Sequence, residues 1–130
     1  MTDGELVALA FAARERAYAP YSRFPVGAAL ECADGAVFTG CNVENAAYGS
    51  SICAERTALV KAVSEGKRAF RRLAIAGGAA HCFPCGACRQ MLYEFAPALI
   101  VLAAGEDKSF VRLSLADELL PRGFGPAFLS

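Results

Sequence analysis

The pattern of hydrophobic and polar positions along the chain predicts helices that alternate with short apolar strands. Residues 5–18 carry apolar side chains at the three- and four-residue spacing of an amphipathic helix, which Pro20 ends. Residues 24–32 and 36–42 are apolar runs on either side of Ala33-Asp34-Gly35, a pattern typical of a β-hairpin. The first sheet unit is therefore expected to be antiparallel.

Two further helices are expected, at residues 52–65 and 84–95. Ser50 and Ser51 are candidates for the N-cap of the first, with Glu55 near the spacing of a capping box. The remaining expected elements are strands at 72–77, 98–103 and 110–113, a helical turn at 117–120, loops at 43–51 and 78–83, a turn at 105–109 and a Gly/Pro-rich tail at 121–130.

This order of elements predicts an α/β fold in which helices cover both faces of the sheet. The link at 105–109 is too short for a parallel crossover, so the last two strands are expected to be antiparallel. With 130 residues and no internal repeat or linker, residues 1–130 are expected to form a single domain.

Composition narrows the classes of function. Thirteen basic and thirteen acidic residues cancel and form no basic stripe, so a small, neutral or weakly charged substrate is expected rather than a nucleic acid or a membrane surface. The acidic N-terminus lacks a signal-peptide core, and no apolar stretch reaches the roughly 20 residues of a membrane span. A cytoplasmic location is therefore expected. Hydrophobic residues make up 55% of the chain, which favours some burial between subunits.

Two short motifs carry the candidate chemistry, Cys53-Ala54-Glu55 and Pro84-Cys85-Gly86-Ala87-Cys88. Each lies at a predicted helix start, where the helix dipole favours a thiolate, and two helix starts at one sheet edge would bring the three sulfurs together. Three protein ligands leave the fourth tetrahedral position of a zinc ion open for water. Glu55 is placed to move the protons of that water, and Arg56 to offset the negative charge of the thiolates.

Other interpretations of these cysteines remain open. Cys82, Cys85 and Cys88 have the spacing of an iron–sulfur run, which Cys53 could complete. A closed four-cysteine zinc site and a redox pair are further options, and in each of them Glu55 has no chemical role.

The other candidate ligands are expected to be structural. Cys32 and Cys41 lie in apolar runs and are expected to be small core residues. His81 stands alone in a predicted loop and is expected to be a surface residue.

Five segments resemble the small, three-cysteine type of cytidine deaminase, in the same order and over nearly the whole chain. They are residues 18–24, 26–30, 40–48, 53–58 and 84–90, which read YAPYSRF, VGAAL, GCNVENAAY, CAERTA and PCGACRQ. The resemblance implies a three-layer α/β/α fold with a five-stranded mixed sheet. It also implies the zinc-dependent hydrolysis of cytidine and 2′-deoxycytidine to uridine and 2′-deoxyuridine plus ammonia, in pyrimidine salvage.

The resemblance assigns roles to the metal centre. Cys53, Cys85 and Cys88 would hold one zinc per subunit. Glu55 would carry a proton from the attacking water to ring nitrogen N3 and later protonate the departing amine, while Arg56 would tune the cysteines. The family's small members are homotetramers, so a homotetramer is expected.

The resemblance also implies substrate contacts around that centre. Asn42 and Glu44 would hydrogen-bond the ribose hydroxyls, and Phe24 would pack on the pyrimidine. The other implied contacts are the Ala54 backbone, Ala46 and Tyr48 at the substrate, with Tyr48 and Phe124 in positions that reach a neighbouring subunit's site.

Two rival functions follow from the same motifs. A blasticidin-type nucleoside-antibiotic deaminase would share both cysteine motifs, but it is not expected to share the pair Asn42 and Glu44. A non-catalytic zinc or iron–sulfur module would bind its metal with four thiolates including Cys82 and would not depend on Glu55.

Overall fold

A five-stranded sheet forms the centre of the computed structural model, which describes residues 1–78 and 80–129. The parts of the expected loop and tail at residues 79 and 130 lie outside the described residues. The strand order is β2-β1-β3-β4-β5, with β3 and β4 parallel and every other neighbouring pair antiparallel. The strands are β1 (Gly27–Cys32), β2 (Val37–Cys41), β3 (Phe70–Ala76), β4 (Ile100–Ala104) and β5 (Phe110–Ser114). The hairpin and the antiparallel last pair are thereby confirmed.

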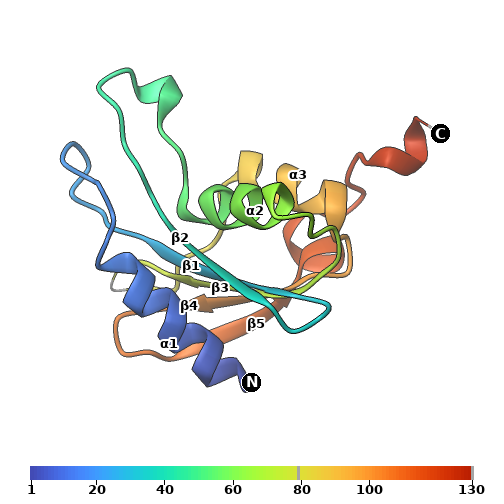
Figure 1. Ribbon diagram of the computed structural model, residues 1–130, viewed down its shortest axis with the longest axis horizontal. Helices are drawn as coiled ribbons and strands as arrows, with labels where there is room; N and C mark the ends of the chain where they lie inside the picture. The colour runs from blue at the N-terminus through green and yellow to red at the C-terminus, as the bar shows by residue number, and fades with distance from the viewer. Residues whose placement is uncertain (79, 130) are drawn as a thin grey trace.

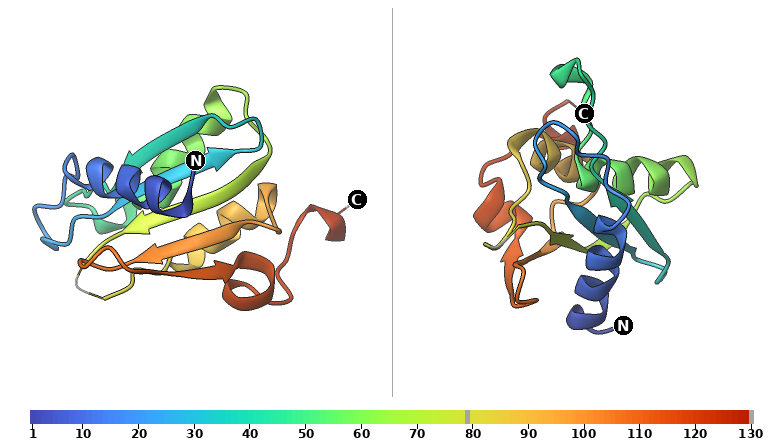
Figure 2. Two further views of the ribbon diagram at one scale, coloured as in Figure 1. Left: turned by 90° about the horizontal axis from the view of Figure 1, so that it is seen from below. Right: turned by 90° about the vertical axis from the view of Figure 1, so that its left-hand side faces the viewer.

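Helices cover both faces of this sheet (Figure 1). Helix α1 (Asp3–Arg14) lies on one face, whereas α2 (Ala54–Ser64) and α3 (Gly86–Phe95) lie side by side on the other (Figures 1 and 2). Successive strand residues point to opposite faces, so Ala29 packs in the cluster beneath α1 and Leu30 in the cluster beneath α2 and α3. The three-layer α/β/α arrangement is therefore confirmed.

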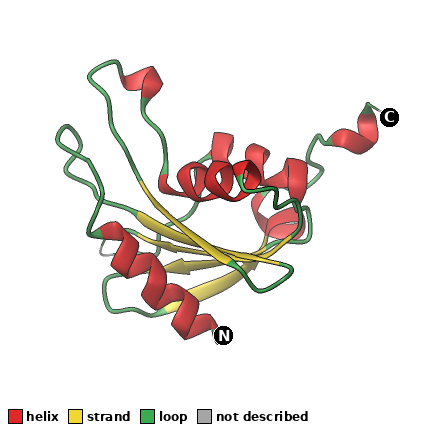
Figure 3. Cartoon of the chain, in the orientation of Figure 1, coloured by secondary structure: helices red, strands yellow, loops and turns green. Residues whose placement is uncertain are grey.

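Three short helical turns complete the described chain. They are a 3₁₀ turn at Tyr48–Ser50, a π-helical turn at Leu115–Leu119 and a 3₁₀ turn at Pro126–Phe128. The π-helical turn begins two residues before the helical turn expected at 117–120. The loop that carries Tyr48–Ser50 and the C-terminal segment both extend away from the body of the molecule (Figure 3). Among the described residues, no helix has the length and apolar character that a membrane span requires.

Helix α1 begins and ends earlier than the pattern predicts. Thr2 forms a capping box with Glu5, in which the Glu5 N–H donates to Thr2 Oγ1 at 3.1 Å and the Thr2 N–H donates to Glu5 Oε1 at 2.8 Å. The helix stops at Arg14 because the chain then turns to run beside residues 42–44, which follow β2. There the Tyr18 N–H donates to the Asn42 carbonyl at 3.0 Å.

The expected capping of α2 by Ser50 or Ser51 is wrong. Cys53 is the N-cap, and the helix begins at Ala54 rather than at 52. Residue Ile52 is extended and exchanges both backbone hydrogen bonds with Val43, at 2.9 Å each, so the helix cannot begin there.

Helix α3 also begins two residues later than expected, with Cys85 as its N-cap. Neither Cys53 nor Cys85 makes a side-chain capping hydrogen bond, which leaves both sulfurs free for other partners.

The start of the first strand is also corrected. Residues 24–26 were expected in the strand, but β1 begins at Gly27. The Val26 N–H instead donates to Asn42 Oδ1 at 2.8 Å, so a side chain takes the place of a neighbouring strand.

Gly40 allows α2 to lie directly on β2. A Cβ atom at this position would lie 2.5 Å from the Ala58 nitrogen and 2.7 Å from the Ala54 oxygen, both closer than real contacts. The absence of a side chain at Gly40 therefore lets the N-terminal part of α2 lie close to the sheet. Cys53 and Glu55 lie at this end of the helix.

Candidate metal centre and its cavity

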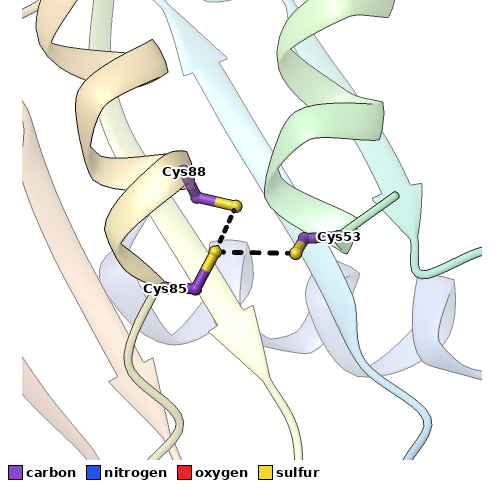
Figure 4. Close-up of side chains that lie close together, drawn as sticks. All are labelled: Cys53, Cys85 and Cys88. Atoms are coloured by element: carbon purple, nitrogen blue, oxygen red, sulfur yellow. Dashed lines mark hydrogen bonds between the residues drawn. The ribbon is translucent and has the colours of Figure 1, made fainter. Parts of the chain in front are cut away.

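Three cysteine sulfurs meet between the N-termini of α2 and α3 (Figure 4). Cys53 Sγ lies 3.7 Å from Cys85 Sγ, which lies 3.3 Å from Cys88 Sγ, and all three sulfurs are within 4.8 Å of one another. Sulfurs that share one tetrahedral zinc at about 2.3 Å are about 3.8 Å apart. The cluster therefore has the donor type, the number and nearly the spacing of a three-thiolate zinc site.

Charge within this cluster is concentrated on Cys53. A hydrogen bond from Cys88 lowers the pKa of Cys53 to about 5, and Arg56 lowers it further. The same contact with Cys53, together with burial, raises the pKa of Cys88 well above its ordinary value. Cys53 is thus the preferred thiolate of this pair, as its place at a helix N-terminus favours.

Glu55 lies in the first turn of α2 and is only 4% exposed. Burial raises the pKa of Glu55 to about 7, and the negative charge of Cys53 contributes to the rise. A carboxyl group with a pKa near neutrality can both accept and donate a proton, as general acid–base catalysis requires.

Arg56 extends from α2 toward the cluster. Its Nη2 donates to the Ser51 carbonyl at 3.3 Å and to Cys53 Sγ at 3.8 Å. Its Nε is buried and has no hydrogen-bond partner among the described residues. The guanidinium therefore faces the Cys53 sulfur, and its buried Nε–H is still available as a donor.

A cavity of about 280 Å³ opens beside the cluster. Cys53, Cys85 and Glu55 line it, together with four of the six expected substrate contacts, which are Phe24, Asn42, Glu44 and Ala54. Four further residues line it: Ser22, Val26 and Phe83, which had no expected role, and Cys82, which was expected here only as a possible fourth metal ligand. For Ser22, Val26 and Phe83, the sequence gives no signal beyond their position next to expected site residues.

The two expected ribose ligands hold the loop that carries Phe24. Asn42 Nδ2 donates to the Phe24 carbonyl at 3.0 Å, while its Oδ1 accepts from Val26. Glu44 Oε1 accepts from the backbone N–H groups of Tyr21, at 2.9 Å, and Ser22, at 3.0 Å, and its Oε2 accepts from the Ser22 hydroxyl. Both side chains thus build one wall of the cavity.

The structure does not bring the other expected contacts into this cavity. Ala46 and Tyr48 lie in the exposed loop before α2, where the Tyr48 ring meets the Tyr21 ring edge-on at 5.9 Å. Phe124 lies in the C-terminal segment and stacks on Phe128 at 5.4 Å. Tyr48 and Phe124 are 73% and 56% exposed, so their rings are available to another surface.

The remaining cysteines and the histidine are placed outside the metal cluster. Cys82 lines the cavity, and burial raises its pKa to about 11, so it stays a neutral thiol. Cys32 is a core residue as expected, but Cys41 is only half-buried, with its Sγ donating to the Arg16 carbonyl at 3.4 Å. His81 contacts Ser109 Oγ at 3.1 Å.

Among residues 1–78 and 80–129, the cluster of possible metal ligands consists of Cys53, Cys85 and Cys88. A site with four thiolates that includes Cys82, whether zinc or iron–sulfur, is therefore not favoured.

Comparison with known proteins identifies relatives over nearly the whole chain. Residues 1–104 match a family model described as the cytidine and deoxycytidylate deaminase zinc-binding region. A cytidine deaminase from Sporosarcina psychrophila is 46% identical over 127 residues, which are 97% of this chain and 93% of the relative.

Solved structures give the same result. The crystal structure of a cytidine deaminase from Burkholderia pseudomallei matches with a TM-score of 0.91 and 49% identity, over 95% of this chain and 100% of that one. A cytidine deaminase from Mycobacterium tuberculosis matches with a TM-score of 0.82 and 40% identity, over 96% and 99% of the two chains.

Proposed function

Because the chain belongs to the cytidine and deoxycytidylate deaminase family, we propose that it hydrolyses the 4-amino group of cytidine and 2′-deoxycytidine. The products are uridine or 2′-deoxyuridine and ammonia. The observation that carries this proposal is the position of Glu55, a buried carboxyl group on the same cavity as the cysteine cluster.

Cys53, Cys85 and Cys88 would hold the zinc ion that the family requires. Their spacing and their soft thiolate donors fit zinc, and three ligands leave one position open. When bound, zinc supplies the Lewis acidity that makes a water molecule nucleophilic at neutral pH.

Glu55 would transfer the protons of the reaction. It would take one proton from the water that attacks C4 and deliver it to N3 of the pyrimidine. It would then take the second proton from the new C4 hydroxyl group and pass it to the amine, which leaves as ammonia while the C4 carbonyl forms. One carboxyl group can serve both steps because burial places its pKa at about 7, so both protonation states are accessible.

Asn42 and Glu44 have capacity left for a sugar. Asn42 donates one of its two amide hydrogens to the Phe24 carbonyl, and its side-chain oxygen accepts one hydrogen bond, from the Val26 N–H, of the two that it can accept. Glu44 accepts three hydrogen bonds from Tyr21 and Ser22, out of about four that a carboxylate can accept. Each side chain can therefore hydrogen-bond a ribose hydroxyl while it holds the loop.

The same pair favours a nucleoside over the alternatives. Free cytosine has no hydroxyl for Asn42 and Glu44 to recognise, and a nucleoside-antibiotic deaminase is not expected to carry this pair. Phe24 offers its ring to the base from the loop that both side chains hold.

We extend the proposal to the assembly and the cellular role. The exposed rings of Tyr48 and Phe124 support a homotetramer in which they reach a neighbouring subunit's site, and Ala46 lies in the same loop as Tyr48. A single-domain chain acting in pyrimidine salvage in the cytoplasm is the setting we propose. Native mass spectrometry that finds only monomers at micromolar concentration would contradict the assembly.

The proposed reaction is tested with Glu55→Gln and a matched control, Glu65→Gln. Glu65 follows α2 and is exposed, so its variant changes a carboxylate at the other end of the same helix. Ammonia release from cytidine should fall by about 10²- to 10⁴-fold in Glu55→Gln, as for loss of a general acid–base group, and stay unchanged in Glu65→Gln. Both variants should retain zinc by elemental analysis. Near wild-type turnover by zinc-loaded Glu55→Gln would contradict the assignment.

Substrate class is tested by offering cytidine and free cytosine side by side. Release of ammonia from cytidine alone agrees with the roles of Asn42 and Glu44. Equal turnover of both would contradict the sugar contacts but leave the zinc–Glu55 chemistry in place.

A further inference from the structure

Cys82 belongs to the wall of the cavity without belonging to the metal cluster. It lies in the segment between β3 and α3, three residues before Cys85, and its side chain is half-buried against the core beneath α2 and α3. Its backbone is fixed, because the Cys82 N–H donates to the Ala104 carbonyl at 3.2 Å. The backbone of Cys82 is therefore anchored at the wall of the cavity that Glu55, Cys53 and Cys85 also line.

The space behind this side chain is closed by Gly77. A Cβ atom on Gly77 would lie 2.7 Å from Cys82 Sγ, 2.8 Å from Cys82 Cβ and 3.4 Å from Phe24 Cζ. The side chain of Cys82 and the ring of Phe24 thus rest on the same glycine. A larger side chain at position 82 has no room to move back and must extend into the cavity.

The proposed function fixes how a pyrimidine lies in this space, and the inference rests on it. C4 must lie beside the cysteine cluster, at the open position of the metal, and N3 must lie next to Glu55, on the side of the cluster that α2 forms. In the pyrimidine ring, N3 and C5 are bonded to C4 on opposite sides. The C5 edge therefore faces the segment that precedes α3. Figure 4 shows Cys53 entering the cluster from α2, and Cys85 and Cys88 from α3. Along the chain, Cys82 belongs to the segment that leads to α3.

We propose that Cys82 is a specificity-determining residue that limits the size of the substituent at C5 of the base. A thiol is a small, weakly polar group, so it forms an apolar wall that leaves room beside C5. A longer side chain would fill that room and exclude substrates with a 5-substituent, while cytidine itself, with hydrogen at C5, would still fit. Where a pocket is already filled, one extra methyl group on a substrate changes the ratio of kcat/KM values between the two substrates by about 10- to 200-fold.

The test compares kcat/KM for cytidine and 5-methylcytidine in the wild-type protein, Cys82→Leu and Cys82→Ala. The ratio of 5-methylcytidine to cytidine should fall by about 10-fold or more in Cys82→Leu and rise in Cys82→Ala. Cys41→Ala is the matched control, because Cys41 is another half-buried cysteine and lies outside this cavity. Its ratio should equal that of the wild type.

A merely structural role for Cys82 would lower both rates together and leave the ratio unchanged. An unchanged ratio in Cys82→Ala and Cys82→Leu, in proteins that retain zinc and deaminate cytidine, would overturn the inference and leave the proposed function standing. If Cys82→Leu does not fold, Cys82→Val takes its place with the same expected direction. A zinc-loaded wild-type protein that releases no ammonia from either nucleoside would overturn the proposed function and the inference with it.

Discussion

Arg56 contacts the thiolate cluster but has no proton to transfer in the proposed reaction. Its guanidinium donates to Cys53 and contributes to the lowered pKa of that thiol. Replacing Arg56 with Gln should therefore weaken zinc binding and lower kcat/KM by about 10- to 100-fold, the usual effect of a residue that supports a metal ligand. The loss should be smaller than in Glu55→Gln.

The measurement is activity together with the rate of zinc loss to a chelator. Arg56→Lys keeps the charge but loses the planar donor group, so it should fall between Arg56→Gln and the wild type. Equal losses of activity in Arg56→Gln and Glu55→Gln at full zinc loading would contradict this ranking.

At the scale of residues, the sequence predicted the parts of the site that depend on spacing. Cys85 and Cys88 are three residues apart at the start of one helix, and Cys53 and Glu55 share a short motif at the start of another. The proximity of the two residues within each pair therefore follows from local structure. The wall formed by Cys82 was not predictable, because it depends on how the chain packs against Gly77. Sequence spacing cannot indicate that contact.

At the scale of elements, the contact between α2 and β2 positions half of the metal centre. Gly40→Ala would place a methyl group within 3 Å of two α2 backbone atoms, which must then move. Overpacking of this kind costs about 1–3 kcal/mol. The variant should unfold at lower denaturant concentration and lose zinc to a chelator faster than the wild type. Gly49→Ala is the control, since nothing lies within 4 Å of a Cβ atom there. Equal stability of the two variants would show that α2 adjusts freely.

Element types were predictable from hydrophobic periodicity, whereas several element ends were not. The start of α2 is set by the pairing of Ile52 with Val43, and the end of α1 by the hydrogen bond from Tyr18 to Asn42. Both contacts join segments more than eight residues apart, so no local pattern reveals them. The late start of α2 matters for the site, because it makes Cys53 the N-cap and leaves its sulfur facing the cluster.

At the scale of the whole molecule, one group of charged side chains joins the N-terminus to three strands. Arg72 on β3 donates to Glu31 on β1 and to Asp3 in α1, at 2.7 Å in each contact, and Arg112 on β5 donates to Asp3 at 2.7 Å. Glu31 is only 4% exposed. A buried carboxylate that loses its partner is costly, so Arg72→Met should destabilise the fold by about 3 kcal/mol.

The same contacts predict how stability depends on pH. Hydrogen bonds from Arg72 hold the pKa values of Glu31 and Asp3 below their ordinary values in the folded state. A carboxyl group with a lowered folded pKa contributes its full stabilisation above its unfolded pKa of about 4, and it loses that contribution as the pH falls through the folded pKa. In urea unfolding experiments, the free energy of unfolding of the wild type should therefore decrease below about pH 4, and the decrease should be smaller in Arg72→Met.

Acid also releases zinc by protonating thiolates, so the wild type alone would not isolate this effect. The difference between wild type and Arg72→Met at each pH does isolate it, because both proteins keep the same cysteine cluster. That difference should be largest at pH 7 and shrink toward pH 3. Arg71→Met, at the exposed neighbouring position of β3, should change this pH dependence much less, because the charge of Arg71 lowers the pKa of Glu31 less than the hydrogen bond from Arg72 does. A constant difference between wild type and Arg72→Met across this range would mean that Arg72 stabilises the fold through packing of its side chain and not through its charge.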